Sequence, residues 1–316
     1  MTPPIVIARN AVTKQSRSSE TPGTETTEMT FRVIDGMREL APQYDGFILD
    51  LWGVVHDGTA PFPGVLDCMG RLIAAGKRLV LLSNAPRRAD DVVRRIEKIG
   101  VPAGLYHGVM SSGEEAWLHL AHRDDPFYAA LGRRVLQIGS ERDLEMRAGL
   151  DLDFVATPAE ADFILNTGPA EWQDTIEDYA PLLDAACRRG LPMVCANPDL
   201  VVIHNGRPAL CAGALAEHYE AIGGRVRWHG KPHRSVYDSC LTLLGIDDRR
   251  RILAIGDSLR TDIAGAAGAG IDSLLIAGGV HAAEFIRDGA LDHDRIATAL
   301  AESGTQPIGV AAHFVW

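Results

Sequence analysis

The chain has 316 residues, of which 46% are hydrophobic and 23% charged, a composition typical of soluble globular proteins. This length is sufficient for about two domains. The formal net charge of -11 would repel a phosphate backbone, so we expect no binding to nucleic acid. No uninterrupted apolar run approaches the roughly 18 residues of a membrane-spanning helix, so we expect no membrane partner.

The five cysteines form no Cys-x-x-Cys pair, and an odd number of widely spaced cysteines argues against a disulfide framework. We therefore expect a cytoplasmic protein. Residues 1–28 are rich in Ser, Thr and Pro and poor in large apolar side chains, which predicts a disordered leader. This segment lacks the charged and then apolar order of a secretory signal, and translation from Met29 stays an alternative.

From residue 44 onward, short apolar runs alternate with amphipathic stretches, which is the order of β-α-β units on a parallel sheet. The first series comprises residues 46–51, 64–76, 78–83 and 88–99. The middle of the chain has its own alternation, at residues 134–139, 153–157, 161–166, 173–188 and 192–196. The pattern of the first series returns near the end, at residues 251–257, 259–269, 272–277 and 282–302.

One core split by an insert is the simplest arrangement, because neither flank alone supplies a full sheet. We predict an α/β fold with a doubly wound, parallel-sheet (Rossmann-like) core built from residues 40–131 and 210–316. A smaller inserted α/β domain is expected at residues 132–209. The apolar helices of this insert offer a surface for a homo-oligomer, and the oligomeric state stays open.

Polar residues follow several of the predicted strands, where ligands bind in open α/β sheets. These are Asp50 after "FIL", Ser83 after "LVLL" and Asp257 after "ILAIG", with Lys231 in "HGKPH" before a predicted helix and with Asn84, Ser258 and Asp262 nearby. Paired carboxylates suit a hard divalent cation, a lysine offsets negative charge, and a hydroxyl can bond an oxyanion. This set of groups matches phosphoryl transfer, with Asp50 as a nucleophile that forms an aspartyl-phosphate.

Four segments in this order carry a resemblance to a known family: "DLWGVVHDG", "LLSNAPR", "HGKPH" and "IGDSLRTDI". They resemble the four motifs of the haloacid dehalogenase-like hydrolase superfamily. The insert, with "ANPDLVV" near its end, resembles the cap domain of subgroup IIA, which contains phosphatases of sugar phosphates, nucleotides and pyridoxal phosphate. The resemblance implies a magnesium-dependent hydrolase of a small phosphorylated metabolite.

The resemblance also implies roles for individual residues. Asp50 would be the nucleophile, and it would bind Mg²⁺ together with the backbone carbonyl of Trp52, Asp257 and Asp262. Ser83 and Asn84 would bind the phosphoryl group, and Lys231 would pair with Asp50 and the phosphoryl oxygens. Asn197 and Asp199 would face the substrate. Two simpler readings stay open. Asp262 is also typical of the first turn of a helix, and Asn197 to Asp199 is also typical of an ordinary turn.

Trp52 departs from the family pattern, because relatives that hydrolyse phosphate esters carry a second aspartate there as general acid and base. An indole can do neither job, and the loss should slow turnover without preventing nucleophilic attack. Three outcomes compete. His56, or Asp57 beside it, supplies the proton; the nucleophile attacks carbon instead; or the protein is a catalytically weak phosphate-ligand-binding or regulatory protein. Trp52 as simple core packing is a further alternative.

Two other patterns are interpreted as coincidental. "GDSL" at residues 256–259 resembles the nucleophile block of a serine esterase family, but none of the 11 histidines follows an Asp at the Asp-x-x-His spacing. Four histidines at short spacings lack the Cys or additional His partners of a structural zinc site, and we expect them to be solvent-exposed. They are His119, His122, His229 and His233.

Overall fold

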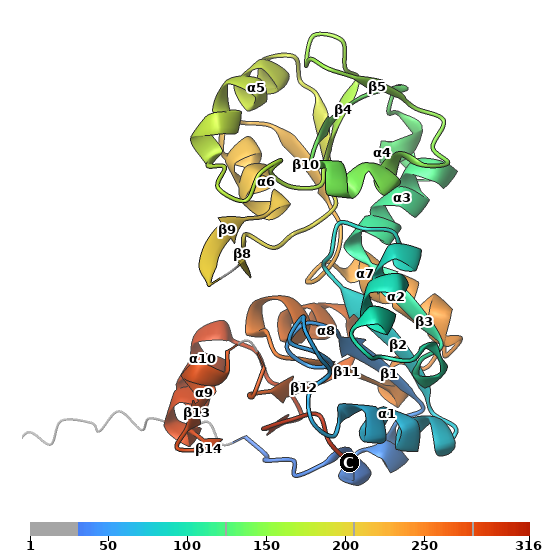
Figure 1. Ribbon diagram of the computed structural model, residues 1–316, viewed down its shortest axis with the longest axis vertical. Coiled ribbons are helices and arrows are strands. Elements are labelled where there is room, and N and C mark those ends of the chain that lie inside the picture. Colours follow the sequence, from blue (N-terminus) through green and yellow to red (C-terminus); the bar gives the residue numbers. More distant parts are fainter. Residues whose placement is uncertain (1–30, 124, 205, 280) are drawn as a thin grey trace, which may run out of the picture.

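The computed structural model describes residues 31–316 except residues 124, 205 and 280. The leader predicted at residues 1–28 lies outside the described residues. The described chain forms a lower and an upper half, each built on its own parallel sheet (Figure 1). Within the described part, no helix combines the length and apolar character that crossing a membrane requires.

The lower half is the core, and its sheet has six parallel strands in the order β15-β12-β11-β1-β2-β3. Their bounds are Gly46–Asp50 for β1, Arg78–Ser83 for β2, Gly108–Ser111 for β3, Ile252–Gly256 for β11, Asp272–Ile276 for β12 and Gly309–Ala311 for β15. The chain builds outward from β1 to β3 and then returns to build outward from β11 to β15. The order therefore reverses between β1 and β11, and the carboxyl ends of these two strands meet at that point.

Helices cover both faces of the core sheet, which explains why its strands are continuous apolar runs. All residues of β1 are buried; Phe47 and Leu49 pack with α1 (Val65–Ala74) and α2 (Ala89–Lys98), whereas Ile48 packs with α7 (Arg234–Leu244) and α8 (Ala264–Ala269). The prediction of a doubly wound α/β core is therefore confirmed.

The upper half is the cap, whose sheet has five parallel strands in the order β10-β7-β6-β4-β5. The strands are β4 (Arg134–Ile138), β5 (Asp153–Val155), β6 (Phe163–Asn166), β7 (Pro192–Cys195) and β10 (Arg225–Trp228). Helices α5 (Ile176–Arg188) and α6 (Ala212–Ala221) pack on one face, and α3 (Ser112–His122) and α4 (Pro126–Ala129) pack on the other. The fold thus has an inserted α/β cap, but α3 and α4 precede the predicted start at residue 132 and pack on the cap sheet.

The cap sheet continues beyond the predicted boundary at residue 209. β10 pairs in parallel with β7, so the residues up to Trp228 belong with the cap and not with the core. β10 lies at the edge of the sheet, none of its residues is fully buried, and two of its four residues are arginine. A half-buried edge strand lacks the continuous apolar run by which the other strands were recognised.

The predicted amphipathic stretch at residues 282–302 is also interrupted. It contains α9 (Ala282–Phe285), a small antiparallel pair of β13 (Ile286–Arg287) and β14 (Ala290–Leu291), and α10 (His293–Ser303). Asp288 and Gly289, between the two strands, have φ values of 52° and 81°. Asp-Gly is a strong signal for such a tight turn, so the interruption was readable in the sequence.

The remaining elements connect the two halves and close the core. A hairpin of β8 (Val201–His204) and β9 (Arg207–Leu210) reaches from the cap toward the core (Figure 1). The short helical turns are η1 (Met37–Glu39), η2 (Ala41–Gln43), η3 (Ala103–Leu105), η4 (Glu141–Arg147), η5 (Arg249–Arg251) and the π-type turn η6 (Leu259–Ile263).

Candidate active site

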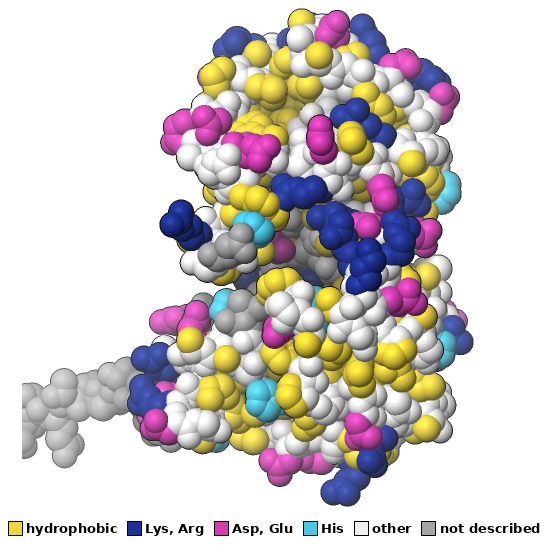
Figure 2. Space-filling model, viewed as in Figure 1, with side chains coloured by type: hydrophobic (Ala, Val, Ile, Leu, Met, Phe, Trp, Pro, Cys, Tyr) yellow, Lys and Arg dark blue, Asp and Glu magenta, His cyan; other side chains and the backbone are white. Residues whose placement is uncertain are grey.

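A cleft of about 1190 Å³ separates the core from the cap, and Figure 2 shows it as a hollow across the middle of the molecule. Most of the candidate site residues of the sequence line this cleft, whereas Asp57 does not; those that do include Asp50, Trp52, His56, Ser83, Asn84, Asn197, Asp199, Lys231, Asp257 and Asp262. They come from segments far apart in the chain. The fold brings them together because the carboxyl ends of β1, β2 and β11 lie side by side at the reversal point of the sheet.

Three buried carboxylates and one lysine form the centre of the site. Asp50 ends β1, Asp257 follows β11, and Asp262 lies in η6, with carboxylate oxygens within 4.8 Å of one another. Lys231 Nζ donates to Asp50 Oδ1 at 2.5 Å and to Asp262 Oδ1 at 2.8 Å. Asp262 Oδ2 also accepts from the Ser258 N–H at 3.2 Å, so its helix-terminus reading holds beside its contact with the lysine.

The electrostatics of this centre are those of a cation site. Burial raises the pKa of Asp50 well above its usual range, and the charges of Asp262 and Asp257 add to the rise while Lys231 opposes it. Burial disfavours the charged form of Lys231, but Asp262 and Asp50 outweigh it and hold the lysine pKa well above normal. Three carboxylates thus face one ammonium group. An oxygen-only donor set with excess negative charge fits a hard divalent cation.

Ser83 and Asn84 end β2 in different surroundings. Ser83 Oγ accepts from the Ala85 N–H at 3.2 Å, which leaves its hydroxyl proton able to donate toward the cleft. Asn84 is buried, and its amide is engaged: Nδ2 donates to Asp199 Oδ1 at 2.8 Å and to the Lys231 carbonyl at 3.1 Å, while Oδ1 accepts from the Lys231 N–H at 2.8 Å. Asn84 therefore fixes the backbone of the lysine.

The segment from Asn197 to Asp199 is a turn that also belongs to the cleft. Asn197 Oδ1 accepts from the Asp199 N–H at 2.9 Å, the bond that defines an Asx turn. Burial raises the pKa of Asp199, and its hydrogen bond from Asn84 opposes that rise. The hydrogen bond from Asn84 to Asp199 joins a cap segment to the end of β2. The turn is confirmed, and contact of this segment with a substrate stays a prediction.

Trp52 is not a core residue, and the packing alternative is wrong. Its side chain is 46% exposed and lines the cleft. The ring meets His56 edge to face, with centroids 5.9 Å apart, and lies so close to Gly58 that a Cβ there would be 2.6 Å from it. Gly53 has a φ of 97°, and a Cβ at this position would lie 2.0 Å from Asp257 Oδ2. The loop after Asp50 can therefore approach Asp257 this closely only because residue 53 is glycine.

The contacts of His56 and Asp57 do not suit the proposed acid–base role. Burial lowers the pKa of His56, which keeps the ring neutral at pH 7, and its Nδ1 accepts from the Gly58 N–H at 3.0 Å. A neutral ring in this arrangement carries its proton on Nε2 and has no nitrogen left to act as a base. Asp57 is exposed, and its hydrogen bonds from Thr59 and Ala60 lower its pKa to about 2, so it carries no proton to donate at pH 7.

One residue that supports the site was missed in the sequence: Glu115 of α3, which is 1% exposed. Its Oε2 accepts from the Gly230 N–H at 2.9 Å and lies 3.2 Å from Nδ1 of His229. His229 Nε2 in turn contacts the Tyr128 hydroxyl. These contacts hold the chain immediately before Lys231. No residue type or spacing marks Glu115, because its partners lie more than 100 residues away in the chain.

The prediction of solvent-exposed histidines is wrong for three of the four. His229 is 1% exposed, and His119 and His233 are half-buried; only His122 is exposed. Burial of His229 follows from its place between Glu115 and Tyr128, where both ring nitrogens face polar atoms. A histidine that precedes a functional loop can thus serve to anchor that loop.

We expect Glu115→Ala to lower the free energy of unfolding by about 1–3 kcal/mol, because the Gly230 N–H would stay buried without an acceptor. Urea unfolding of the whole chain measures this. The matched control is Glu217→Ala on α6, which is exposed and should change stability by no more than about 0.5 kcal/mol. Equal effects of the two substitutions would show that Glu115 does not anchor the loop.

Comparison with known proteins agrees with this geometry. A family model described as haloacid dehalogenase-like hydrolase matches residues 47–153, and a second, described as HAD-hydrolase-like, matches residues 228–303. A solved haloacid dehalogenase-like hydrolase from Brucella suis 1330 is 36% identical, with a TM-score of 0.75 and coverage of 89% of this chain and 100% of that one. The chain belongs to the haloacid dehalogenase-like hydrolase family.

Two further relatives of this haloacid dehalogenase-like hydrolase have specific names. The D-glycerol 3-phosphate phosphatase of Mycobacterium tuberculosis is 29% identical over 251 residues, which is 78% of this chain and 67% of the relative. A structure of glycerol phosphate phosphatase from M. tuberculosis in complex with magnesium is 26% identical, with a TM-score of 0.61 and coverage of 76% of this chain and 70% of that one. The protein is therefore an enzyme of the hydrolase class, and the subgroup IIA resemblance is confirmed.

Proposed function

We propose that this hydrolase cleaves a small phosphorylated metabolite by transferring its phosphoryl group to Asp50, with Mg²⁺ as the cofactor. The observation that carries the proposal is the buried group of Asp50, Asp257, Asp262 and Lys231 at the reversal point of the core sheet. Membership of a hydrolase family favours this reading over a ligand-binding protein without turnover. The magnesium complex of the M. tuberculosis phosphatase supports the choice of metal.

Each residue of the centre would contribute one part of the transfer. A carboxylate oxygen of Asp50 attacks phosphorus, the bond to the ester oxygen breaks, and an aspartyl-phosphate forms. Lys231 favours the ionised form of Asp50 and offsets the charge of the phosphoryl oxygens, and the Ser83 hydroxyl donates to one of them. Asp50, Asp257, Asp262 and the Trp52 carbonyl would hold Mg²⁺, which neutralises charge on the transferring group.

The cleavage and hydrolysis steps both need a proton transfer for which this site offers no obvious side chain. The departing ester oxygen needs a proton, and the water that attacks the aspartyl-phosphate must lose one. Trp52 stands where relatives carry the aspartate for both tasks, and the contacts of His56 and Asp57 do not replace it. We propose a slow enzyme whose rate depends strongly on the leaving group.

The proposed substrates follow from the relatives and from the cleft. The M. tuberculosis relative is named a D-glycerol 3-phosphate phosphatase, and a cleft of about 1190 Å³ between core and cap admits a metabolite of that size. Closure of the cap over the core would exclude water while the ester bond breaks. We therefore propose an alkyl phosphate of a small metabolite as the natural substrate.

Phosphate release from 4-nitrophenyl phosphate and from an alkyl phosphate, each with Mg²⁺ and with excess EDTA, tests the proposal. We expect metal-dependent release from both, with the aryl ester faster by about 10² or more because its leaving group needs no proton. Equal rates would show that another side chain supplies the acid. Absence of metal-dependent release from either ester would contradict the proposal and favour attack on carbon or ligand binding without turnover.

A further inference from the structure

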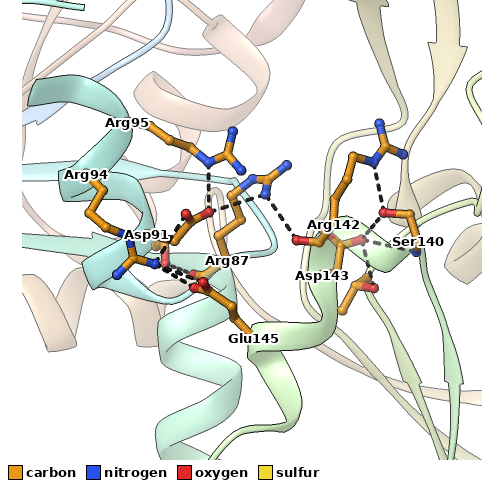
Figure 3. A network of polar contacts seen from close by, with 10 residues as sticks. Arg87, Asp91, Arg94, Arg95, Ser140, Arg142, Asp143 and Glu145 are labelled. Carbon is orange, nitrogen blue, oxygen red and sulfur yellow. Dashed lines mark hydrogen bonds and ion pairs between the residues drawn. The ribbon is translucent and has the colours of Figure 1, made fainter. Parts of the chain in front are cut away.

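Four arginines of the core and the cap meet on one side of the cleft, away from the metal-binding carboxylates. Arg87, Arg94 and Arg95 come from α2 and the residues before it, and Arg142 comes from η4 of the cap; all four line the cleft. Figure 2 shows basic side chains gathered on the right of the hollow, and Figure 3 shows the four residues from close by. We call these residues the arginine cluster.

The arginine cluster holds more positive charge than its ion pairs offset. Asp91 alone pairs with three arginines: Oδ2 accepts from Arg87 at 3.3 Å and from Arg95 at 2.8 Å, and Oδ1 accepts from Arg94 at 3.4 Å. Glu145 adds one more carboxylate, on Arg94. Three of the four guanidinium groups therefore share two carboxylates, and Arg142 has no ion pair among the described residues, in a protein whose overall charge is -11.

A third carboxylate close by does not balance the excess through a direct ion pair. Asp143 accepts from Ser140 and Thr167, and none of the hydrogen bonds in the described residues joins it to an arginine. Asp143 lowers the surplus charge of the region but leaves it positive. A surplus that faces a substrate cleft attracts an anion.

The arginines also have unused donors. A guanidinium has five N–H donors; in the described chain, Arg95 donates through Nε alone and Arg87 through Nη1 alone. Arg142 donates from Nε to Ser140 Oγ at 2.9 Å and from Nη2 to the Ala170 carbonyl at 3.4 Å. Figure 3 shows the guanidinium groups of Arg87, Arg95 and Arg142 pointing to the same side.

The cluster is held in place from both halves of the molecule. Ser111 Oγ donates to the Arg87 carbonyl at 2.5 Å, which fixes the loop after β2. The Arg142 guanidinium lies over the Trp172 ring at 4.0 Å, and Trp172 stacks on His204 of the hairpin with centroids 3.9 Å apart. Charged groups that are fixed before binding lose little freedom when an anion binds.

The cluster lies within the reach of a small substrate. Arg87 follows Ser83 by four residues, so their Cα atoms are at most about 14 Å apart. The arginine side chain can shorten that distance further. A molecule held by its phosphoryl group at Ser83 and Lys231 could thus place its other end at the arginine cluster.

We infer that the substrate carries a second anionic group, a carboxylate or a second phosphate, which Arg87, Arg95 and Arg142 bind while the phosphoryl group being cleaved lies at Asp50. This inference rests on the proposed function and narrows its substrate class. Guanidinium groups recognise carboxylate and phosphate oxygens in the same way, through paired charge-assisted hydrogen bonds. Because Arg142 belongs to the cap and Arg95 to the core, the anion would also draw the two halves together.

The experiment compares kcat/KM for two matched pairs of substrates with Mg²⁺. One pair is 3-phosphoglycerate and glycerol 3-phosphate of the same configuration, in which a carboxylate replaces a hydroxymethyl group. The other pair is fructose 1,6-bisphosphate and fructose 6-phosphate, which differ by one phosphate. We expect the wild type to prefer the member with the additional anion by about tenfold or more in at least one pair, which also tells carboxylate from phosphate. In Arg95→Met and Arg142→Met this preference should fall by about tenfold or more.

The control is Arg250→Met. Arg250 is 88% exposed, pairs with Asp248 and precedes β11, so it lies at the edge of the core sheet opposite to the cleft. The control should keep the preference of the wild type. Thermal unfolding of each variant verifies that all are folded.

Two results would overturn the inference in different ways. If phosphate is released but both members of each pair react equally, or the arginine variants keep the wild-type preference, the arginine cluster does not select the substrate and the proposed function stands. If no phosphate is released from these esters or from 4-nitrophenyl phosphate, the proposed function fails and the inference fails with it.

Discussion

Replacing Asp50 with asparagine should lower metal-dependent phosphate release by about 10⁴-fold or more, the scale seen when an enzyme loses its nucleophile. Asparagine has nearly the same shape and can still accept a hydrogen bond from Lys231, but its amide oxygen does not attack phosphorus. The substitution also removes one of three buried carboxylates that repel one another. We therefore expect the melting temperature to stay the same or to rise, which separates loss of chemistry from loss of folding.

The matched control for Asp50→Asn is Asp67→Asn. Asp67 lies in α1, its side chain is 61% exposed and it pairs only with Arg71 in the described residues. This control should keep the wild-type rate. Phosphate release by Asp50→Asn within about tenfold of the wild type would contradict the role of Asp50, because loss of a nucleophile lowers the rate by much more than tenfold.

Replacing Trp52 with aspartate should raise the turnover of an alkyl phosphate by about 10² to 10⁴, the usual contribution of a general acid and base. Trp52 is 46% exposed and lines the cleft two residues after Asp50, so a carboxylate there would face the substrate. The gain should be smaller for 4-nitrophenyl phosphate, which would use the aspartate for hydrolysis of the aspartyl-phosphate but not for protonation of its leaving group. The ratio of the two rates is therefore the informative quantity.

Trp52→Asn controls for the loss of the indole. It has the size of aspartate but cannot transfer a proton, so it should not accelerate the alkyl ester. If Trp52→Asn and Trp52→Asp gave equal gains, the ring would act by blocking the cleft and not by standing in for an acid. If neither changed the rate, another residue would already supply the proton.

The parts of the site that the sequence predicted lie at the ends of buried strands. β1 and β11 are covered on both faces, so their apolar runs are continuous, and a polar residue ends each run at the reversal point. Asp50, Ser83 and Asp257 could be placed in this way from local pattern alone. Lys231 and Asp262 were candidates from loops beside these strand ends, and their individual roles required the order of the four motifs.

The parts that the sequence did not predict depend on contacts between distant segments. Glu115 acquires its role from Gly230 and His229, and one sequence carries no information about that pairing. The role proposed for His56 depended on its residue type, whereas the hydrogen bond from Gly58 decides which nitrogen carries the proton. The sequence pattern did not predict β10, because it is a half-buried edge strand without a continuous apolar run.

The most direct test of the central claim is to trap the phosphoryl group on the enzyme. Because the indole of Trp52 cannot activate water, the aspartyl-phosphate should break down slowly and accumulate. Acid quenching of the enzyme during turnover of 4-nitrophenyl phosphate, followed by peptide mass spectrometry, would locate it. We predict a phosphoryl group on the peptide that contains Asp50, absent from Asp50→Asn. Phosphate release without a phosphorylated Asp50, or with the label on another residue, would contradict the account.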